Sequence, residues 1–347
     1  MRLSDFDYAL PAELIAQEAA RVRDSARLLR LDRATGVRSH HRVADLDALL
    51  EPGDVLVVND TRVVPARLLG RREPSGGAVE CLLLERLDGE RWDALVHPGQ
   101  KLKVGSRAVF EGAGRRLEIE VLARHYHGRR TIRLSAEDGN VDAAMDAIGH
   151  VPLPPYIKRA DRPIDHERYQ TVYAAARGSV AAPTAGLHFT PALLDRLQAR
   201  GVEQHAITLH VGYGTFEPVR TEDVEAHRVA PERYVVPAST ATAVNRALDE
   251  GRRVIAVGTT TTRTLEAVAR AHGGRLQPCA GETDLYIHGD FDFRVVGGLL
   301  TNFHLPRSSL LLLVCALAGR DAILAAYREA VEKRYRFYSY GDAMLIL

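Results

Sequence analysis

The pattern of apolar residues changes twice along the chain, and this change constrains the fold more than any other feature. Before residue 65 and after residue 150, buried strand patterns alternate with helix patterns, as is typical of α/β proteins. Between them, the apolar segments are short and alternating, and turns such as Gly76-Gly77 and Asp88-Gly89 divide them. We therefore predict an α/β fold: a large, mixed, partial-barrel-like domain (residues 1–64 and 150–347) with an inserted small antiparallel β-barrel domain (residues 65–149).

The length and the net charge of the chain limit the number of domains and the classes of binding partner. A chain of 347 residues exceeds one typical core, which fits two domains. The net charge of +1 provides no overall field toward nucleic acid or membrane, so any basic patch is local. Cys81, Cys279 and Cys315 lie far apart, without metal or disulfide spacing. We expect a cytoplasmic monomer without a metal site and without a membrane segment, because the apolar run at 310–318 is too short to span a bilayer.

Polar loops follow several predicted strands. In an open α/β sheet, ligands bind in the loops at the carboxyl ends of the strands. The alternative for each loop is an ordinary turn or helix cap without a ligand. The loop residues that we expect to bind substrate are Asn59, Asp60, Thr61, Arg62, Pro183, Thr184, Ala185, Gly186, Leu187, Phe189, Thr190, Gly212, Gly214, Thr215, Phe216, Gly258, Thr259, Thr260, Arg263, Thr301, Asn302 and Phe303.

Two of these loops have specific local expectations. Val180-Ala181-Ala182 is expected to end a strand, and Thr190 is expected to cap a helix that begins at Pro191. The hydroxyls after Gly258 stand at a predicted helix N-terminus, where backbone N–H groups can hold an anion. The alternative there is a capped helix with no ligand.

Histidines in or near these loops suggest proton transfer close to neutral pH. They are His188, His210, His227 and His304, and a single histidine of this kind is more often a packing residue. The chain has no H-E-x-x-H, C-x-x-C, G-x-S-x-G, dinucleotide or P-loop motif. Metal-dependent hydrolysis and a serine nucleophile are therefore disfavoured.

A basic run lies within the predicted insert. Residues 124–133 contain four arginines and no acid. The functional interpretation is that Arg124, Arg129 and Arg130 hold RNA through its phosphates. The alternative is a solvated strand edge whose charges prevent edge-to-edge pairing.

Several long segments of the chain are informative when taken together. Among them are residues 59–67 (NDTRVVPAR), 152–157 (PLPPYI), 178–190 (GSVAAPTAGLHFT), 301–306 (TNFHLP) and 335–344 (YRFYSYGDAM). These segments resemble the S-adenosylmethionine:tRNA ribosyltransferase-isomerases of the queuosine pathway, and the resemblance implies that the RNA held by Arg124, Arg129 and Arg130 is tRNA. The resemblance runs nearly end to end. It implies transfer and isomerisation of the ribosyl part of S-adenosylmethionine onto 7-aminomethyl-7-deazaguanine at the tRNA wobble position. Epoxyqueuosine would form, adenine and methionine would leave, and S-adenosylmethionine would be the co-substrate with no further cofactor.

Such chemistry needs a base, an acid and a carboxylate or aromatic face for the sulfonium. His188, His210, His304 and Glu232 are the candidate catalytic residues, and the sequence does not divide the roles among them. The chain has Val229 and Ala230 where the family usually has methionine and histidine, and Gly297 where it usually has aspartate.

Three alternatives to this enzyme remain at this stage. They are a divergent paralogue with another substrate, a non-catalytic RNA-binding protein, and a methyltransferase. The last lacks a glycine-rich first-strand signature in this sequence.

Overall fold

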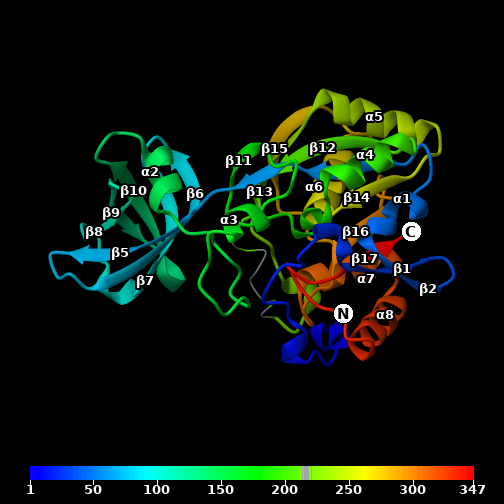
Figure 1. Ribbon diagram of the computed structural model, residues 1–347, viewed down its shortest axis with the longest axis horizontal. Coiled ribbons are helices and arrows are strands. Elements are labelled where there is room, and N and C mark those ends of the chain that lie inside the picture. Colours follow the sequence, from blue (N-terminus) through cyan, green and yellow to red (C-terminus); the bar gives the residue numbers. More distant parts are fainter. Residues whose placement is uncertain (213, 215–218, 220) are drawn as a thin grey trace.

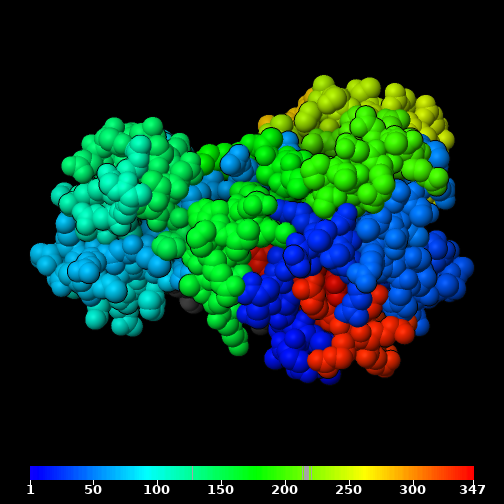
Figure 2. Space-filling view, viewed as in Figure 1, coloured from blue at the N-terminus to red at the C-terminus, as the bar shows by residue number. Residues whose placement is uncertain are grey.

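The computed structural model describes residues 1–212, 214, 219 and 221–347. A nine-stranded mixed sheet with helices forms the larger part, and a closed six-stranded antiparallel barrel forms the smaller one (Figure 1). In the space-filling view the barrel is a separate lobe beside the larger body (Figure 2). The predicted fold class, an α/β protein with a small antiparallel barrel, is confirmed.

The large sheet has the strand order β15-β13-β12-β3-β14-β16-β17-β1-β2. Its strands are β1 (Arg27–Leu31), β2 (Arg38–Arg42), β3 (Val55–Asn59), β12 (Glu203–Leu209), β13 (Glu232–Val236), β14 (Val254–Val257), β15 (Cys279–Thr283), β16 (Gly298–Asn302) and β17 (Ala343–Ile346). The four neighbours β12, β3, β14 and β16 are parallel. The loops after these four strands therefore lie at one edge of the sheet, as the sequence indicates.

Helices cover both faces of this sheet, because its central strands are apolar on both sides. Val55 and Val57 of β3 pack into one core, and Leu56 and Val58 pack into the other. The first core contains α5 (Ala238–Asp249), α6 (Thr259–Ala271), α7 (Ser309–Ala318) and α8 (Arg320–Glu332). The second contains α1 (Leu46–Leu49) and α4 (Pro191–Ala199).

The barrel closes in the order β10-β7-β6-β5-β8-β9. Its strands are β5 (Arg67–Glu73), β6 (Ala78–Asp88), β7 (Arg91–His97), β8 (Arg107–Gly112), β9 (Arg115–Arg124) and β10 (Arg129–Ala136). Alternate residues of β9, namely Leu117, Ile119 and Val121, fill its interior, as a period of two requires. Helix α2 (Val141–Ile148) packs on the same core, and all these elements fall within residues 65–149.

The segment after residue 175 differs from expectation. The strand there is β11 (Ala176–Ser179), which pairs with β4 (Thr61–Val63), and residues 180–182 are not a strand. The single turn α3 (Asp165–Arg168) comes before it, and the 3-10 helix η7 (Thr184–His188) follows. The strand stops early because the amide of Val180 bonds to the carbonyl of Val211, outside the β4 pairing.

In the described part of the chain, no single helix is long and apolar enough to span a membrane. Helices α7 and α8 reach that length and apolar character only together, and the pair is bent by 116°.

Candidate functional site

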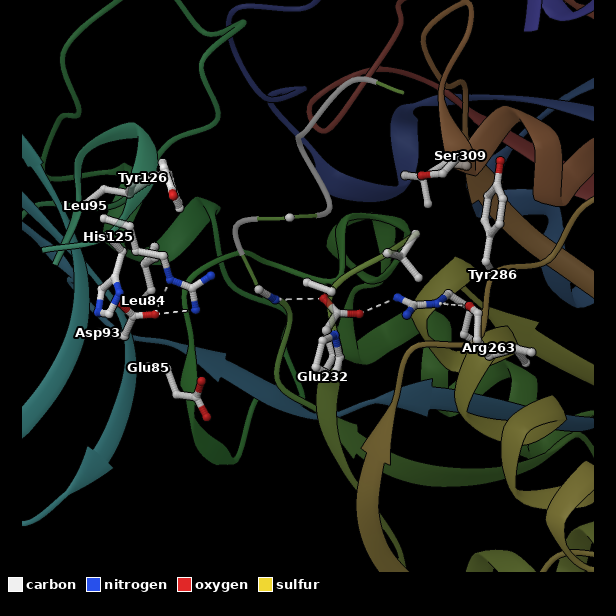
Figure 3. A pocket seen from close by; sticks show the side chains of 18 of the residues that line it. Leu84, Glu85, Asp93, Leu95, His125, Tyr126, Glu232, Arg263, Tyr286 and Ser309 are labelled. Carbon is white, nitrogen blue, oxygen red and sulfur yellow. Dashed lines mark hydrogen bonds and ion pairs between the residues drawn. The ribbon is translucent and has the colours of Figure 1, made fainter. Parts of the chain in front are cut away.

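A cavity of about 830 Å³ lies between the barrel and the large sheet (Figure 3). Strands β6, β7 and β10 and the 3-10 helix η6 (Tyr126–Gly128) form one wall. Strand β13, helix α6, the segment 285–287 and the start of α7 form the other. Ion pairs among the described residues join the lobes: Arg233 of β13 pairs with Glu85 of β6, and Arg177 of β11 pairs with Asp142 and Asp146 of α2.

A buried ion pair, Glu232 with Arg263, lies in the large-sheet wall of the cavity. Both residues are less than one-tenth exposed. Glu232 Oε1 accepts a hydrogen bond from the amide of Gly212 at 2.8 Å, and Arg263 Nε donates to the carbonyl of Leu285 at 2.9 Å. This pair therefore fixes β13, α6 and two loops around one carboxylate.

Tyr286 belongs to the same wall. Its hydroxyl is buried and has no hydrogen-bond partner among the described residues. Burial raises the pKa of this phenol to about 12, so the hydroxyl stays protonated and can donate a hydrogen bond. Val229 and Ala230, where the sequence departs from the usual family residues, also line the cavity.

The barrel wall presents His125, Tyr126, Asp93 and Arg129. The Nε2 atom of His125 lies 2.9 Å from Thr131 Oγ1. Asp93 is buried and forms an ion pair with the half-exposed Arg129. Figure 3 shows His125 and Tyr126 on one side of the cavity and Tyr286 on the other. Residues of both lobes therefore line the cavity.

Two predicted catalytic histidines lie elsewhere. Nε2 of His188 accepts a hydrogen bond from Asn302 Nδ2 at 3.2 Å, and burial lowers the pKa of His188 to about 4. Nε2 of His304 lies 2.9 Å from Thr301 Oγ1, and burial lowers the pKa of His304 to about 3. Neither lines the cavity, and both are neutral near pH 7. Their roles in proton transfer therefore stay predictions, and the geometry of this cavity adds no support for them.

His210 is part of a polar network at the carboxyl edge of the sheet. Its Nδ1 lies 2.8 Å from Thr61 Oγ1, and burial, followed by the charge of Arg233, lowers its pKa. Asn59 links β3 to β12 by donating to the carbonyl of Leu209 at 2.9 Å. His210 lies two residues before Gly212, a residue of the cavity wall, but does not itself line the cavity.

The other edge residues mostly bond within the fold. Thr208 donates to Asp60, and Arg62 is exposed on β4. The side chain of Thr190 accepts from the amide of Leu193, which confirms the predicted cap. Phe303 packs against Tyr327 in the core. The predicted residues Pro183, Ala185, Gly186, Leu187 and Phe189 are buried, Thr184 is half-buried, and none of these six lines the cavity.

The start of α6 does not offer free hydroxyls. Thr261 and Thr262 donate back to the carbonyls of Val257 and Gly258 in the preceding turn. Thr260 Oγ1 accepts from Asn59, and Thr259 is buried. These hydroxyls bond within the fold, and anion binding by the backbone N–H groups at this helix N-terminus stays a prediction. Of the predicted substrate-binding residues, Gly212, Gly214 and Arg263 line the cavity, and Thr215 and Phe216 lie outside the described residues.

The three arginines predicted to hold tRNA have different surroundings. Arg124 is exposed at the end of β9, and Arg129 is paired with Asp93. Arg130 is only 2% exposed, and its guanidinium donates to the carbonyls of Gly99, Leu102, His125 and Arg129. The prediction for Arg130 is corrected, because its side chain points into the barrel and supports its loops.

Sequence reasoning missed several cavity residues. His125 and Tyr126 lie inside the basic run, where the arginines suggested phosphate contact only. Asp93 and Tyr286 had no local pattern to mark them. Among the described residues, no three histidine, cysteine, aspartate or glutamate side chains gather as a possible metal site.

A mixed α/β domain with an inserted barrel, and one cavity walled by both, defines a two-lobed α/β enzyme architecture. Residues 3–346 match the model of the queuosine biosynthesis protein family, so the chain belongs to that family. Relatives named S-adenosylmethionine:tRNA ribosyltransferase-isomerase include those of Symbiobacterium thermophilum, 54% identical, and Desulfitobacterium hafniense, 51% identical, each over 100% of both chains.

A solved structure agrees with this assignment. The crystal structure of the S-adenosylmethionine tRNA ribosyltransferase from Thermotoga maritima is 39% identical, covers 99% of this chain and 100% of its own, and has a TM-score of 0.56. The predicted resemblance is therefore confirmed, and the chain is a member of a transferase-isomerase family. A non-catalytic RNA-binding protein is not favoured.

Proposed function

We propose that this protein transfers and isomerises the ribosyl part of S-adenosylmethionine onto 7-aminomethyl-7-deazaguanine at the wobble position of tRNA, in the cytoplasm. Epoxyqueuosine forms, and adenine and methionine leave. The observation that carries the proposal is the cavity of about 830 Å³, which is lined by residues of both lobes. The chain that contains this cavity belongs to the queuosine biosynthesis protein family. Ligand pockets are commonly about 300–1,000 Å³, so there is room for S-adenosylmethionine and an extruded base.

The large-sheet wall suits the sulfonium. S-adenosylmethionine carries a positive sulfur, and the Glu232 carboxylate lies in the wall with both oxygens held in place. The charge of this carboxylate is balanced by Arg263, so we propose that the negative end of the fixed ion pair meets the sulfonium, because a fixed dipole stabilises a cation without having to reorganise. The protonated Tyr286 hydroxyl is a donor for an oxygen or ring nitrogen of the same substrate.

His125 is the proposed proton carrier. Among the described residues it is the one histidine that lines the cavity. The sulfonium acidifies the ribose C5′ protons, and an imidazole is the side chain best suited to take a proton near neutral pH. The contact of Nε2 with Thr131 orients the ring and leaves Nδ1 for the exchange. Glu232 therefore holds the cation, and His125 moves the proton.

tRNA binding draws on Arg124, which is exposed at the barrel rim. The Arg129 guanidinium, half-exposed and paired with Asp93, adds a positive charge at the cavity mouth. Both are placed to meet phosphate near the base that enters the cavity. We further propose that the protein acts as a monomer and needs no metal.

One incubation tests the function. The protein is mixed with S-adenosylmethionine and tRNA carrying the precursor base, and products are separated. Free adenine and methionine support the proposal. S-adenosylhomocysteine would identify a methyltransferase, and binding without turnover would identify an RNA-binding protein.

A variant tests the proton carrier. In single-turnover assays, His125→Gln is expected to slow adenine release by about 10²–10⁴-fold, the usual contribution of a general acid or base. His166→Gln, at an exposed histidine of α3, is the matched control and should keep the full rate. A normal rate for His125→Gln would remove His125 from the role.

A further inference from the structure

One aromatic ring in the cavity has no role in the fold. Tyr126, on η6 between β9 and β10, is 90% exposed. Among the described residues it is the only aromatic side chain in the set of large hydrophobic residues that the structure leaves exposed. A ring this exposed contributes almost nothing to hydrophobic stabilisation, which is roughly proportional to the apolar area buried. The barrel therefore does not need an aromatic residue here.

The surroundings of Tyr126 suit a flat apolar ligand. The same wall of the cavity contains Leu84, Leu87 and Leu95. Leu87 is 46% exposed, so this apolar surface continues toward solvent. Bases of single-stranded RNA loops bind proteins by stacking on exposed aromatic rings. Tyr126 and its leucine neighbours have this character.

A carboxylate in the same wall supplies a second, independent observation. Asp93 is only 5% exposed and lines the cavity. Its Oδ2 accepts from Arg129, but its buried Oδ1 has no hydrogen-bond partner among the described residues. Buried acceptors are rarely left unpaired in folded proteins. This oxygen therefore points to a donor that arrives with a ligand.

The hydrogen-bond donors on the Watson–Crick edge distinguish the two bases of the proposed reaction, deazaguanine and adenine. A carboxylate only accepts hydrogen bonds. The Watson–Crick edge of a guanine-type base offers two adjacent N–H donors, at N1 and at the 2-amino group. The corresponding edge of adenine offers one donor beside an acceptor, and that acceptor would face the carboxylate unfavourably. A stacking ring with a carboxylate beside it fits deazaguanine better than the adenine of S-adenosylmethionine.

We infer that the barrel wall of the cavity seats the wobble base of the tRNA, with the deazaguanine ring stacked on Tyr126 and its Watson–Crick N–H groups directed to Asp93. This inference rests on the proposed function and assigns a place to one of its two substrates. S-adenosylmethionine then occupies the opposite wall, beside Glu232. The barrel recognises the base, and the large sheet holds the ribosyl donor.

Binding measurements test the ring. Tyr126→Ala is expected to raise the Kd of an anticodon stem-loop carrying the precursor base by about 5- to 150-fold, the range for losing one base–aromatic stack. The Kd of S-adenosylmethionine should not change. Tyr126→Phe should bind as the wild type does, since it keeps the ring, and Val104→Ala is a control at an exposed barrel residue outside the cavity wall.

Two results would overturn this role of Tyr126. One is stem-loop binding by Tyr126→Ala at the wild-type Kd. The other is a loss of S-adenosylmethionine affinity with stem-loop affinity unchanged, which would assign the ring to adenine. Adenine release by the wild-type enzyme is measured separately. If none occurs, the proposed function fails, and the stem-loop measurements still decide whether Tyr126 seats the base.

Base preference tests the carboxylate. The wild type is expected to prefer a stem-loop with the precursor base over the same loop with adenine at that position. Asp93→Asn should reduce this preference by about 5- to 150-fold, the discrimination typical of one bidentate base contact. Arg129→Gln breaks the same ion pair but keeps the carboxylate, so it should weaken the binding of both loops alike and keep the ratio of their Kd values. An unchanged preference in Asp93→Asn would refute the role of Asp93.

Discussion

The buried Glu232–Arg263 pair gives the sharpest prediction about this protein. Both side chains are less than one-tenth exposed, and Arg263 also donates to the carbonyls of Thr283 and Leu285. Glu232→Gln keeps the shape of the side chain but leaves the Arg263 charge buried without a counter-charge. Removing one member of a buried pair typically costs about 3–5 kcal/mol. For a domain of this size, that corresponds to a Tm lower by roughly 6–20 °C.

A double-mutant cycle then measures the interaction energy between Glu232 and Arg263. Urea unfolding is measured for the wild type, Glu232→Gln, Arg263→Gln and the double variant. The double variant has no unpaired buried charge. Its loss of unfolding free energy should therefore be smaller than the sum of the losses in the two single variants by roughly 1–3 kcal/mol. Adenine release should stay low in the double variant, since the carboxylate that we propose for the sulfonium is gone.

A surface pair provides the control for this cycle. Asp249 and Arg275 form an exposed ion pair, and Asp249→Asn should leave the urea midpoint unchanged. The reasoning would be refuted if Glu232→Gln unfolded at the wild-type midpoint, or if the two single losses were simply additive. Either result would mean that solvent in the cavity screens the pair as it screens a surface pair.

Three further predictions concern pH, tRNA and metal. His188 and His304 are buried, with pKa values lowered to about 4 and about 3, so the unfolded chain binds their protons more readily. Their contribution to stability is present above about pH 6.5 and falls by about 1.4 kcal/mol per pH unit for each histidine as the pH drops toward those values. Urea unfolding of the wild type at pH 7, 6 and 5 should show this slope. His188→Gln should make the slope shallower, and the exposed-site variant His166→Gln should leave it unchanged. Equal slopes in all three proteins would contradict this prediction. Arg124→Ala should lower the slope of log Kd for tRNA against log salt concentration by about one and leave the unfolding transition unchanged. Arg130→Ala should instead destabilise the barrel, because the hydrogen bonds of its guanidinium to backbone carbonyls are lost. The opposite pattern in salt titrations and melting curves would reverse the two roles. Adenine release should survive chelation once tRNA folding is controlled for with magnesium-refolded tRNA, and rescue of a chelated enzyme by one divalent ion would show a metal requirement.

Local patterns in the sequence were enough to predict the architecture. Strand β3 is apolar on both faces and therefore belongs in the centre of a sheet covered by helices. The change to short alternating strands predicted the barrel, because a period of two buries one face of each strand. Thr190 capped its helix as expected, since a side-chain oxygen there meets a free amide.

One misassigned residue carried a usable signal. Arg130 shares a strand face with Ile132 and Leu134, two residues and four residues further on, and all three are buried. The period of two therefore placed Arg130 inside the barrel, while Arg129 remained half-exposed on the other face. Charge alone had suggested phosphate contact for both, because charge does not tell which side of a strand a residue occupies.

Only the tertiary structure decided where the cavity lies. The polar loops do meet at one edge of the sheet, but His188, Asn302 and His304 bond to the fold there and stay neutral or buried. The cavity forms instead where the barrel turn with His125 and Tyr126 faces Glu232 and Arg263, more than a hundred residues further along the chain. Periodicity and caps are encoded by neighbouring residues, whereas the meeting of two distant walls depends on how the lobes pack.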